Sequence, residues 1–153
     1  MRTVVEILIV DDSDEDAALT LDVLRDAAPT APVLRLTDGE QALQFICATD
    51  GYVRRPGGLP RLVLLDLHMP GMDGIEVLRA LRARPEMADL PVVLWSSSCN
   101  PLFIEQALQA GANAYHVKPP MLDAYRAEMQ AIVQRWLTAP ATEANTGTSM
   151  RSA

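Results

Sequence analysis

Short runs of consecutive apolar residues alternate along the chain with longer segments in which apolar residues recur every three or four positions. The run at 62–65 is apolar at every position, which is typical of a strand buried on both faces of a parallel sheet, and the other runs are similarly short and rich in apolar residues. They predict five strands, at residues 4–10, 32–36, 62–65, 92–95 and 114–117.

The segments with helical periodicity predict five helices, one after each strand. Local signals mark several of their ends. Ser13 is placed to cap the first helix, Asp73 and Gly74 lead into the third, and Gly111 terminates the fourth. The last helix is predicted over about residues 121–137. Strands and helices in strict alternation predict an α/β fold, a three-layer doubly wound sandwich with helices on both faces of a five-stranded parallel sheet.

The length of 153 residues suits one domain, which we expect over residues 4–138. Residues 139–153 are rich in Ala, Thr and Ser, and we expect a disordered C-terminal tail there. Residues 49–60 contain several glycines and prolines and predict a long loop. No second domain is expected after the last helix.

The composition argues against several classes of function. Twenty acidic against thirteen basic residues give a formal net charge of −7, which disfavours binding to nucleic acid. Cys47 and Cys99 are too few for a disulfide framework and have no metal-ligand spacing, so both are expected to be reduced thiols. Without a signal peptide or an apolar run long enough for a membrane span, the protein is expected in the cytoplasm.

Polar residues stand where the predicted strands end. Asp11 and Asp12 follow the first strand, Asp66 the third, Ser96 the fourth and Lys118 the fifth. In open parallel sheets the functional site lies outside the carboxyl ends of the strands, so these side chains are expected to meet. Clustered carboxylates need a counter-charge, which predicts a Mg²⁺ site. A carboxylate, a metal, an ammonium and a hydroxyl suit phosphoryl transfer, with Asp66 as the nucleophile that becomes an acyl phosphate.

The ordered set of motifs resembles the receiver domain of two-component response regulators. It comprises the acidic pair after the first strand, the block Asp-Leu-His-Met-Pro-Gly-Met-Asp-Gly that begins at Asp66, the strand before Ser96 and the pair Lys118–Pro119. The resemblance covers about residues 4–138 and implies the flavodoxin-like strand order 2-1-3-4-5. It also implies the following roles: Asp66 as phosphoacceptor; Asp11, Asp12, Asp66 and the backbone carbonyl of His68 as Mg²⁺ ligands; Lys118 and Ser96 on the phosphoryl group; Ser96 and Tyr115 as the switch pair; His68 and Ser98 as residues that tune the phosphoryl lifetime.

The same resemblance implies a mechanism. Asp66 takes a phosphoryl group from a phosphohistidine on a partner sensor histidine kinase, Ser96 then moves toward the new oxygens, and Tyr115 swings inward. The chain would not be an enzyme in the usual sense, since it would catalyse only its own phosphorylation and dephosphorylation. The bond between Lys118 and Pro119 is expected to be cis, as is usual in the family.

More narrowly, the chain is similar to the stand-alone regulators paired with bacterial phytochromes. This likeness rests on the loop at 49–60, the serines that begin at Ser96 and a last helix that ends in Trp136 and Leu137. It implies a bacteriophytochrome as the kinase, a downstream phosphotransfer or effector protein, and a homodimer formed through the side that carries the fourth and fifth helices.

Other interpretations of the same residues remain open. A phosphatase of the haloacid-dehalogenase type would need a second Asp two residues after Asp66, where His68 stands. A nucleotide-binding fold would need a glycine-rich phosphate loop after the first strand. The main rival is a receiver-like protein-interaction module that is never phosphorylated. Each residue also has a purely structural interpretation. The acidic pair could serve merely as a helix cap, Lys118 could be a solvated charge and Tyr115 could be an ordinary core residue.

Overall fold

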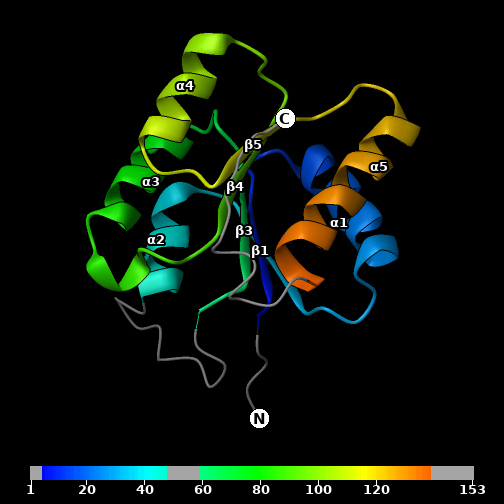
Figure 1. Ribbon diagram of the computed structural model, residues 1–153, viewed down its shortest axis with the longest axis horizontal. Helices are drawn as coiled ribbons and strands as arrows, with labels where there is room; N and C mark the ends of the chain where they lie inside the picture. Colours follow the sequence, from blue (N-terminus) through cyan, green and yellow to red (C-terminus); the bar gives the residue numbers. More distant parts are fainter. Residues whose placement is uncertain (1–4, 48–58, 139–153) are drawn as a thin grey trace.

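The computed structural model of the protein describes residues 5–47 and 59–138 (Figure 1). Its strands are β1 (Ile7–Val10), β2 (Val33–Leu36), β3 (Leu62–Leu65), β4 (Val92–Ser96) and β5 (Ala114–Val117). Its α-helices are α1 (Asp14–Ala27), α2 (Gly39–Cys47), α3 (Gly74–Arg82), α4 (Pro101–Gln109) and α5 (Leu122–Val133). A short 3-10 helix spans Pro85–Met87, and a π-helical turn over Gln134–Thr138 continues α5. Most of the predicted loop at 49–60 and the whole predicted tail at 139–153 lie outside the described residues.

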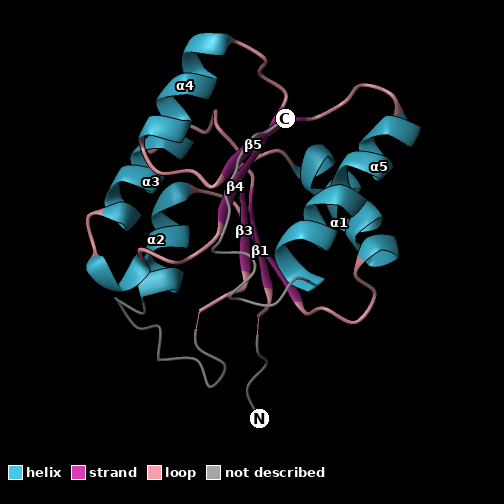
Figure 2. Ribbon diagram, in the orientation of Figure 1, coloured by secondary structure: helices cyan, strands magenta, loops and turns pink. Residues whose placement is uncertain are grey.

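The five strands form one sheet in the order β2-β1-β3-β4-β5, and every neighbouring pair is parallel. The predicted fold class and the flavodoxin-like strand order are therefore confirmed. Seen along its edge, the sheet separates α2, α3 and α4 on one side from α1 and α5 on the other (Figures 1 and 2). In this order β2 and β5 are the edge strands, because the chain moves from β1 to one edge and then returns past β1 to build the sheet toward the other edge.

Two hydrophobic cores fill the spaces between the sheet and the helices. Successive strand residues point to opposite faces, so each apolar run serves both cores. In β1, for example, Leu8 and Val10 belong to the core under α2, α3 and α4, whereas Ile7 and Ile9 belong to the core under α1 and α5. This double burial explains why the central strands are continuous apolar runs.

Three local features differ from the expectations. The first strand begins at Ile7, later than predicted. The last helix changes from α to π geometry after Val133, although Trp136 and Leu137 remain buried, as its periodicity indicates. The bond between Lys118 and Pro119 is trans, so the prediction of a cis bond is wrong. An X-Pro bond prefers trans by only about 0.5–1 kcal/mol, and the sequence alone does not decide between the two isomers.

None of the helices in the described part of the chain combines the length and the apolar character that crossing a bilayer requires.

Candidate functional site

Three carboxylates meet at the carboxyl ends of β1 and β3. Asp11 and Asp12 directly follow β1, and Asp66 directly follows β3. Each offers a carboxylate oxygen, and these oxygens all lie within 4.8 Å of one another. Asp11 is buried, Asp66 is partly buried and Asp12 is exposed, so the cluster opens to solvent on one side. The structure thus brings together the acidic residues that the sequence predicts at this edge.

Lys118 reaches the cluster from the end of β5. Its Nζ donates to Asp11 Oδ2 at 3.0 Å and to Asp16 Oδ2, on the first turn of α1, at 3.4 Å. The side chains of Lys118 and Asp11 are only 5% and 3% exposed. Burial lowers the pKa of Lys118, but the carboxylates of Asp66, Asp11 and Asp16 outweigh it and leave that pKa above its usual value. The ammonium therefore stays charged, held by its acidic neighbours.

Asp66 is a carboxylate in surroundings that oppose its ionisation. Its Oδ1 accepts a hydrogen bond from the backbone N–H of Leu67 at 2.8 Å. Burial raises its pKa, Lys118 lowers it, and the charges of Asp11 and Asp12 raise it again, so that it rises from 3.8 to about 7. One ammonium among several carboxylates leaves an excess of negative charge, and the protonation of Asp66 absorbs it.

This excess of negative charge fits a divalent cation. Three carboxylate oxygens so close together, with an open side toward solvent, match the hard oxygen ligands and the open coordination positions that Mg²⁺ requires. A bound dication would also supply the positive charge that the cluster lacks. The structure therefore supports Asp11, Asp12 and Asp66 as the residues that would hold the metal.

Ser96, Ser98 and Tyr115 lie together on the β4 and β5 side of the site. Ser96 is buried at the end of β4, and its Oγ accepts a hydrogen bond from the backbone N–H of Ser98 at 3.2 Å. The Tyr115 hydroxyl donates to the backbone carbonyl of Ser98 at 2.7 Å. The tyrosine ring is buried, and that burial raises the pKa of its hydroxyl. In this structure, then, Tyr115 already occupies an inward position.

His68 lies two residues after Asp66, in the loop between β3 and α3. Its side chain is exposed, and its ring meets the Phe103 ring of α4 edge to face, with centroids 5.3 Å apart. His68 also lines a pocket of about 360 Å³ together with Met69, Pro70, Gly71 and Asp73. The structure thus sets His68 between the phosphoacceptor candidate and α4.

The turn after Asp66 closes tightly on its own strand. The N–H of Gly74 donates to the Leu67 carbonyl at 2.8 Å, and a Cβ at Gly74 would lie 2.5 Å from the carbonyl oxygen of Asp66. Asp73 caps α3 in a reciprocal capping box with Glu76. Only glycine fits at position 74, and this close approach fixes the backbone that carries Asp66.

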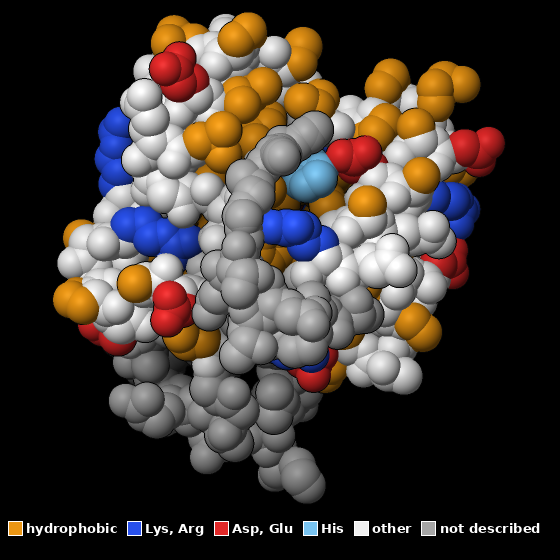
Figure 3. Space-filling model, viewed as in Figure 1, with side chains coloured by type: hydrophobic (Ala, Val, Ile, Leu, Met, Phe, Trp, Pro, Cys, Tyr) orange, Lys and Arg blue, Asp and Glu red, His pale blue; other side chains and the backbone are white. Residues whose placement is uncertain are grey.

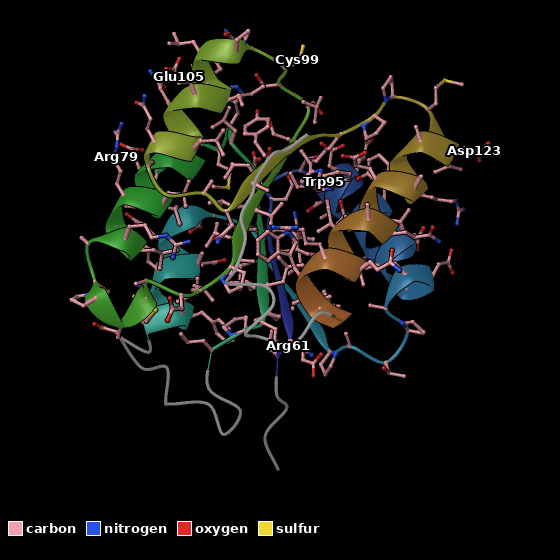
Figure 4. The ribbon with its side chains drawn as sticks, in the orientation of Figure 1. Arg61, Arg79, Trp95, Cys99, Glu105 and Asp123 are labelled. Carbon is pink, nitrogen blue, oxygen red and sulfur yellow. The ribbon has the colours of Figure 1, made fainter. Side chains whose placement is uncertain are left out.

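Sequence reasoning missed three sets of residues around the site. Asp16 binds Lys118 as described above. Arg35, the one charged residue in β2, reaches the backbone of Asp11. Thr20 accepts a hydrogen bond from Trp95 Nε1 at 3.1 Å and pairs with the Tyr125 hydroxyl at 2.9 Å, linking α1, β4 and α5 inside the core. Figure 4 shows Trp95 between the sheet and these helices. Of these residues, only Arg35 was marked in the sequence, because it is a charged residue inside a short apolar strand.

Comparison with known proteins agrees with this geometry. Residues 7–130 match the family model of the response regulator receiver domain. The response regulator Rcp1 of Synechocystis sp. is 33% identical over 131 residues, which cover 86% of this chain and 88% of Rcp1.

Solved structures give the same result. The Mn²⁺-bound form of Rcp1 superimposes with a TM-score of 0.75 at 31% identity, covering 86% of this chain and 93% of the other. The phosphorylated cyanobacterial phytochrome response regulator RcpA gives 0.79 at 30%, covering 88% and 95%. RPA3017, from red light signalling of R. palustris, gives 0.80 at 32%, covering 90% and 97%.

Proposed function

This chain belongs to the response regulator receiver family, and we propose that Asp66 is its phosphoacceptor, taking a phosphoryl group from a phosphohistidine of a sensor histidine kinase. The single observation that carries this proposal is the meeting of Asp11, Asp12 and Asp66 at one edge of the sheet, with Lys118 bound beside them. The receiver-like module that is never phosphorylated would have no use for such a cluster, whose excess negative charge opposes folding.

Asp11, Asp12 and Asp66 would hold Mg²⁺, with the backbone carbonyl of His68 as a further ligand. When bound, the metal supplies positive charge for the phosphoryl oxygens. Structures of relatives support this assignment, since one of them is the Mn²⁺-bound form of Rcp1. The fit rests on the three carboxylate oxygens within 4.8 Å of one another.

The reaction is a transfer between two nucleophiles. A carboxylate oxygen of Asp66 forms a bond to phosphorus while the bond from phosphorus to the histidine nitrogen breaks, and the electron pair of that bond stays on the nitrogen. Lys118 would provide a positive charge near the new phosphoryl oxygens, and Ser96 a hydroxyl donor. His68 and Ser98 would flank the acceptor and set how easily water reaches the acyl phosphate.

The response is proposed to pass from Ser96 to Tyr115 and on to the face formed by α4, β5 and α5. Phosphorylation would draw the Ser96 hydroxyl toward the phosphoryl group and away from the Ser98 N–H. Because Tyr115 donates to the Ser98 carbonyl, a shift of this loop would change the hold on the tyrosine ring. The inward position of Tyr115 in the structure means that the switch would tighten an existing arrangement.

The kinase and the partners are assigned by likeness. RcpA is a phytochrome response regulator and RPA3017 acts in red light signalling, so a bacteriophytochrome is the proposed kinase. Output is proposed through protein contact or through passage of the phosphoryl group to a downstream protein, in the cytoplasm and without nucleic acid. The chain's own chemistry would be limited to its phosphorylation and dephosphorylation.

A homodimer through the α4 and α5 side is also proposed. Exposed large apolar residues lie on both helices, at Leu102 and Leu108 of α4 and at Met121 and Leu122 where α5 begins. Figure 3 shows hydrophobic side chains gathered over α4 and near the start of α5. Sedimentation of the protein with and without phosphorylation would test whether a dimer forms and whether phosphorylation controls it.

One experiment tests the central proposal. The protein is incubated with Mg²⁺ and acetyl phosphate, and intact-mass spectrometry is expected to show one added phosphoryl group. Asp66→Asn should abolish this adduct. Asp123→Asn is the matched control, because Asp123 is an exposed aspartate that points to solvent from α5 (Figure 4). An unmodified wild type, or an adduct that survives in Asp66→Asn, would instead favour the interaction module.

A further inference from the structure

Arg35 makes three hydrogen bonds at the end of β1. Its Nε and Nη2 both donate to the backbone carbonyl of Asp11, at 3.0 and 2.8 Å. Its Nη1 donates to Asp14 Oδ1 at 2.9 Å, on the first turn of α1. The arginine side chain is only 21% exposed. The planar guanidinium thus connects the residue that directly follows β1 to the first turn of α1.

The register of the sheet explains how Arg35 reaches this position. Arg35 pairs with Ile9 across the two parallel strands, and Asp11 lies two residues beyond Ile9 on the same face of β1. The arginine stem runs along the sheet in the direction of the chain until its head meets the Asp11 carbonyl. Since β2 is an edge strand, a long charged side chain can lie here without entering the centre of the core.

The bonds from Arg35 complete the fixation of Asp11. The Asp11 N–H donates to the Leu36 carbonyl, and its carboxylate accepts from the Ser13 N–H and from Lys118 Nζ. Without Arg35, the Asp11 carbonyl would lose both of its donors in the described structure, and the peptide that joins Asp11 to Asp12 would be held less firmly. That peptide sets the direction of both acidic side chains.

We propose that Arg35 is a positioning residue for the Mg²⁺ site, holding the Asp11–Asp12 peptide in the orientation that metal binding needs. This inference rests on the proposed metal site. Arg35 does not touch the carboxylate oxygens that would bind the ion, and it acts through the backbone of Asp11. Residues that orient metal ligands in this indirect way typically change metal affinity by about 10- to 100-fold when they are removed.

Electrostatics and positioning predict opposite effects at Arg35. Removal of a positive charge near an acidic cluster strengthens the attraction for a cation, so charge alone predicts tighter Mg²⁺ binding in Arg35→Met. Loss of the backbone bonds predicts weaker binding. A decrease in affinity therefore cannot come from the change in charge, which makes the sign of the effect informative.

The test is calorimetric titration of the full-length protein with Mg²⁺ alone, without phosphodonor. Arg35→Met is expected to bind about tenfold more weakly than wild type, at the low end of the range above because the action is indirect. Arg25→Met is the matched control, since it removes the same charge from an exposed pair with Asp22 on α1 and should bind as tightly as wild type or slightly more tightly. Urea unfolding of each variant shows whether it is folded under the titration conditions.

A second variant separates geometry from charge. Arg35→Lys keeps the positive charge, but one ammonium cannot reproduce the two bonds to the Asp11 carbonyl together with the bond to Asp14, so its affinity should also fall. It also serves as the test if Arg35→Met does not fold. Wild-type affinity in either folded variant overturns the inference, as does tighter binding. If the wild-type protein binds no Mg²⁺, the proposed metal site is refuted. If wild type binds Mg²⁺ and the variants bind it equally well, only the role of Arg35 is refuted.

Discussion

Replacing Asp66 with Asn should stabilise the metal-free protein at pH 8. The pKa of Asp66 rises from 3.8 to about 7, because burial and the charges of Asp11 and Asp12 oppose its ionisation more than Lys118 favours it. The folded protein must therefore ionise Asp66 against its surroundings above pH 7. An Asn at this position is neutral at every pH and retains an oxygen that can accept the Leu67 N–H.

The sign of the pH dependence follows from proton uptake. Between about pH 4 and pH 7 the folded state holds a proton on Asp66 that the unfolded chain has already released, so stability falls as pH rises through this window. The full rise in pKa corresponds to about 4 kcal/mol. Solvent reaches the open side of the site and screens part of this, so we expect Asp66→Asn to gain about 2 kcal/mol at pH 8 and under about 1 kcal/mol at pH 4.5.

The assay is urea unfolding at both pH values in the presence of EDTA, with circular dichroism as the measure of folded protein. Glu105→Gln is the control, because Glu105 is exposed and points outward from α4 (Figure 4), so it removes one negative charge without touching the site. Its free energy of unfolding should stay within about 0.5 kcal/mol of wild type at both pH values.

Mg²⁺ provides the second arm of the assay. Wild type should gain stability from the ion, by about 2.7 kcal/mol at a concentration one hundred times its dissociation constant, and Asp66→Asn should gain less. The advantage of Asp66→Asn in the free energy of unfolding should therefore become smaller or reverse when Mg²⁺ is present. Equal stability of the two proteins at pH 8 without metal, or a gain for Asp66→Asn that is the same at both pH values, would refute the reasoning.

Three further substitutions probe the contacts around the site. Lys118→Met should lower the free energy of unfolding of the metal-free protein by about 3 kcal/mol in urea, because it leaves the buried Asp11 carboxylate without its ammonium partner. Mg²⁺ should restore part of this loss. An unchanged stability would contradict the buried pair. Gly74→Ala should lower the free energy of unfolding by about 2 kcal/mol and slow phosphorylation from acetyl phosphate, because the added methyl group meets the Asp66 carbonyl oxygen. Wild-type values in both assays would be inconsistent with that close approach. Trp95→Phe should cost about 2 kcal/mol in thermal unfolding by removing the donor to Thr20 and some buried volume, whereas a stability equal to wild type would show that the hydrogen bond adds nothing.

The strand ends were the most predictable part of the molecule. The central strands β1, β3 and β4 consist almost entirely of apolar residues, and a polar residue stands at or just after the end of each, as Lys118 does after β5, so Asp11, Asp66, Ser96 and Lys118 could be assigned to one edge from the sequence alone. The parallel order of the strands needed only the alternation of strands and helices, together with the family resemblance. The site followed from the fold because its members are tied to strand termini, whose positions the apolar runs define.

The contacts of long side chains were not predictable in this way. The bonds of Arg35 depend on its register opposite Ile9, and the Thr20, Trp95 and Tyr125 chain depends on which helices share a face of the sheet. Asp16, on the first turn of α1, reaches Lys118 from a position 102 residues earlier in the chain. Each of these contacts joins residues far apart in the sequence, and periodicity carries no information about such pairs.

The distribution of charge around Lys118 gives a physical reason why Asp66 would be the reactive carboxylate. The hydrogen bonds of Lys118 Nζ in the described residues go to Asp11 and Asp16, so its charge acts on Asp66 without a direct hydrogen bond, and burial together with Asp11 and Asp12 outweighs that charge. Asp66 is left with a pKa of about 7, and a carboxylate of higher pKa is a stronger base and a better nucleophile once it is ionised. Near pH 7 only about half of the metal-free molecules would carry that ionised group. A bound cation would lower this pKa and return Asp66 to the ionised form that reacts, so metal binding and reactivity would be coupled at this residue.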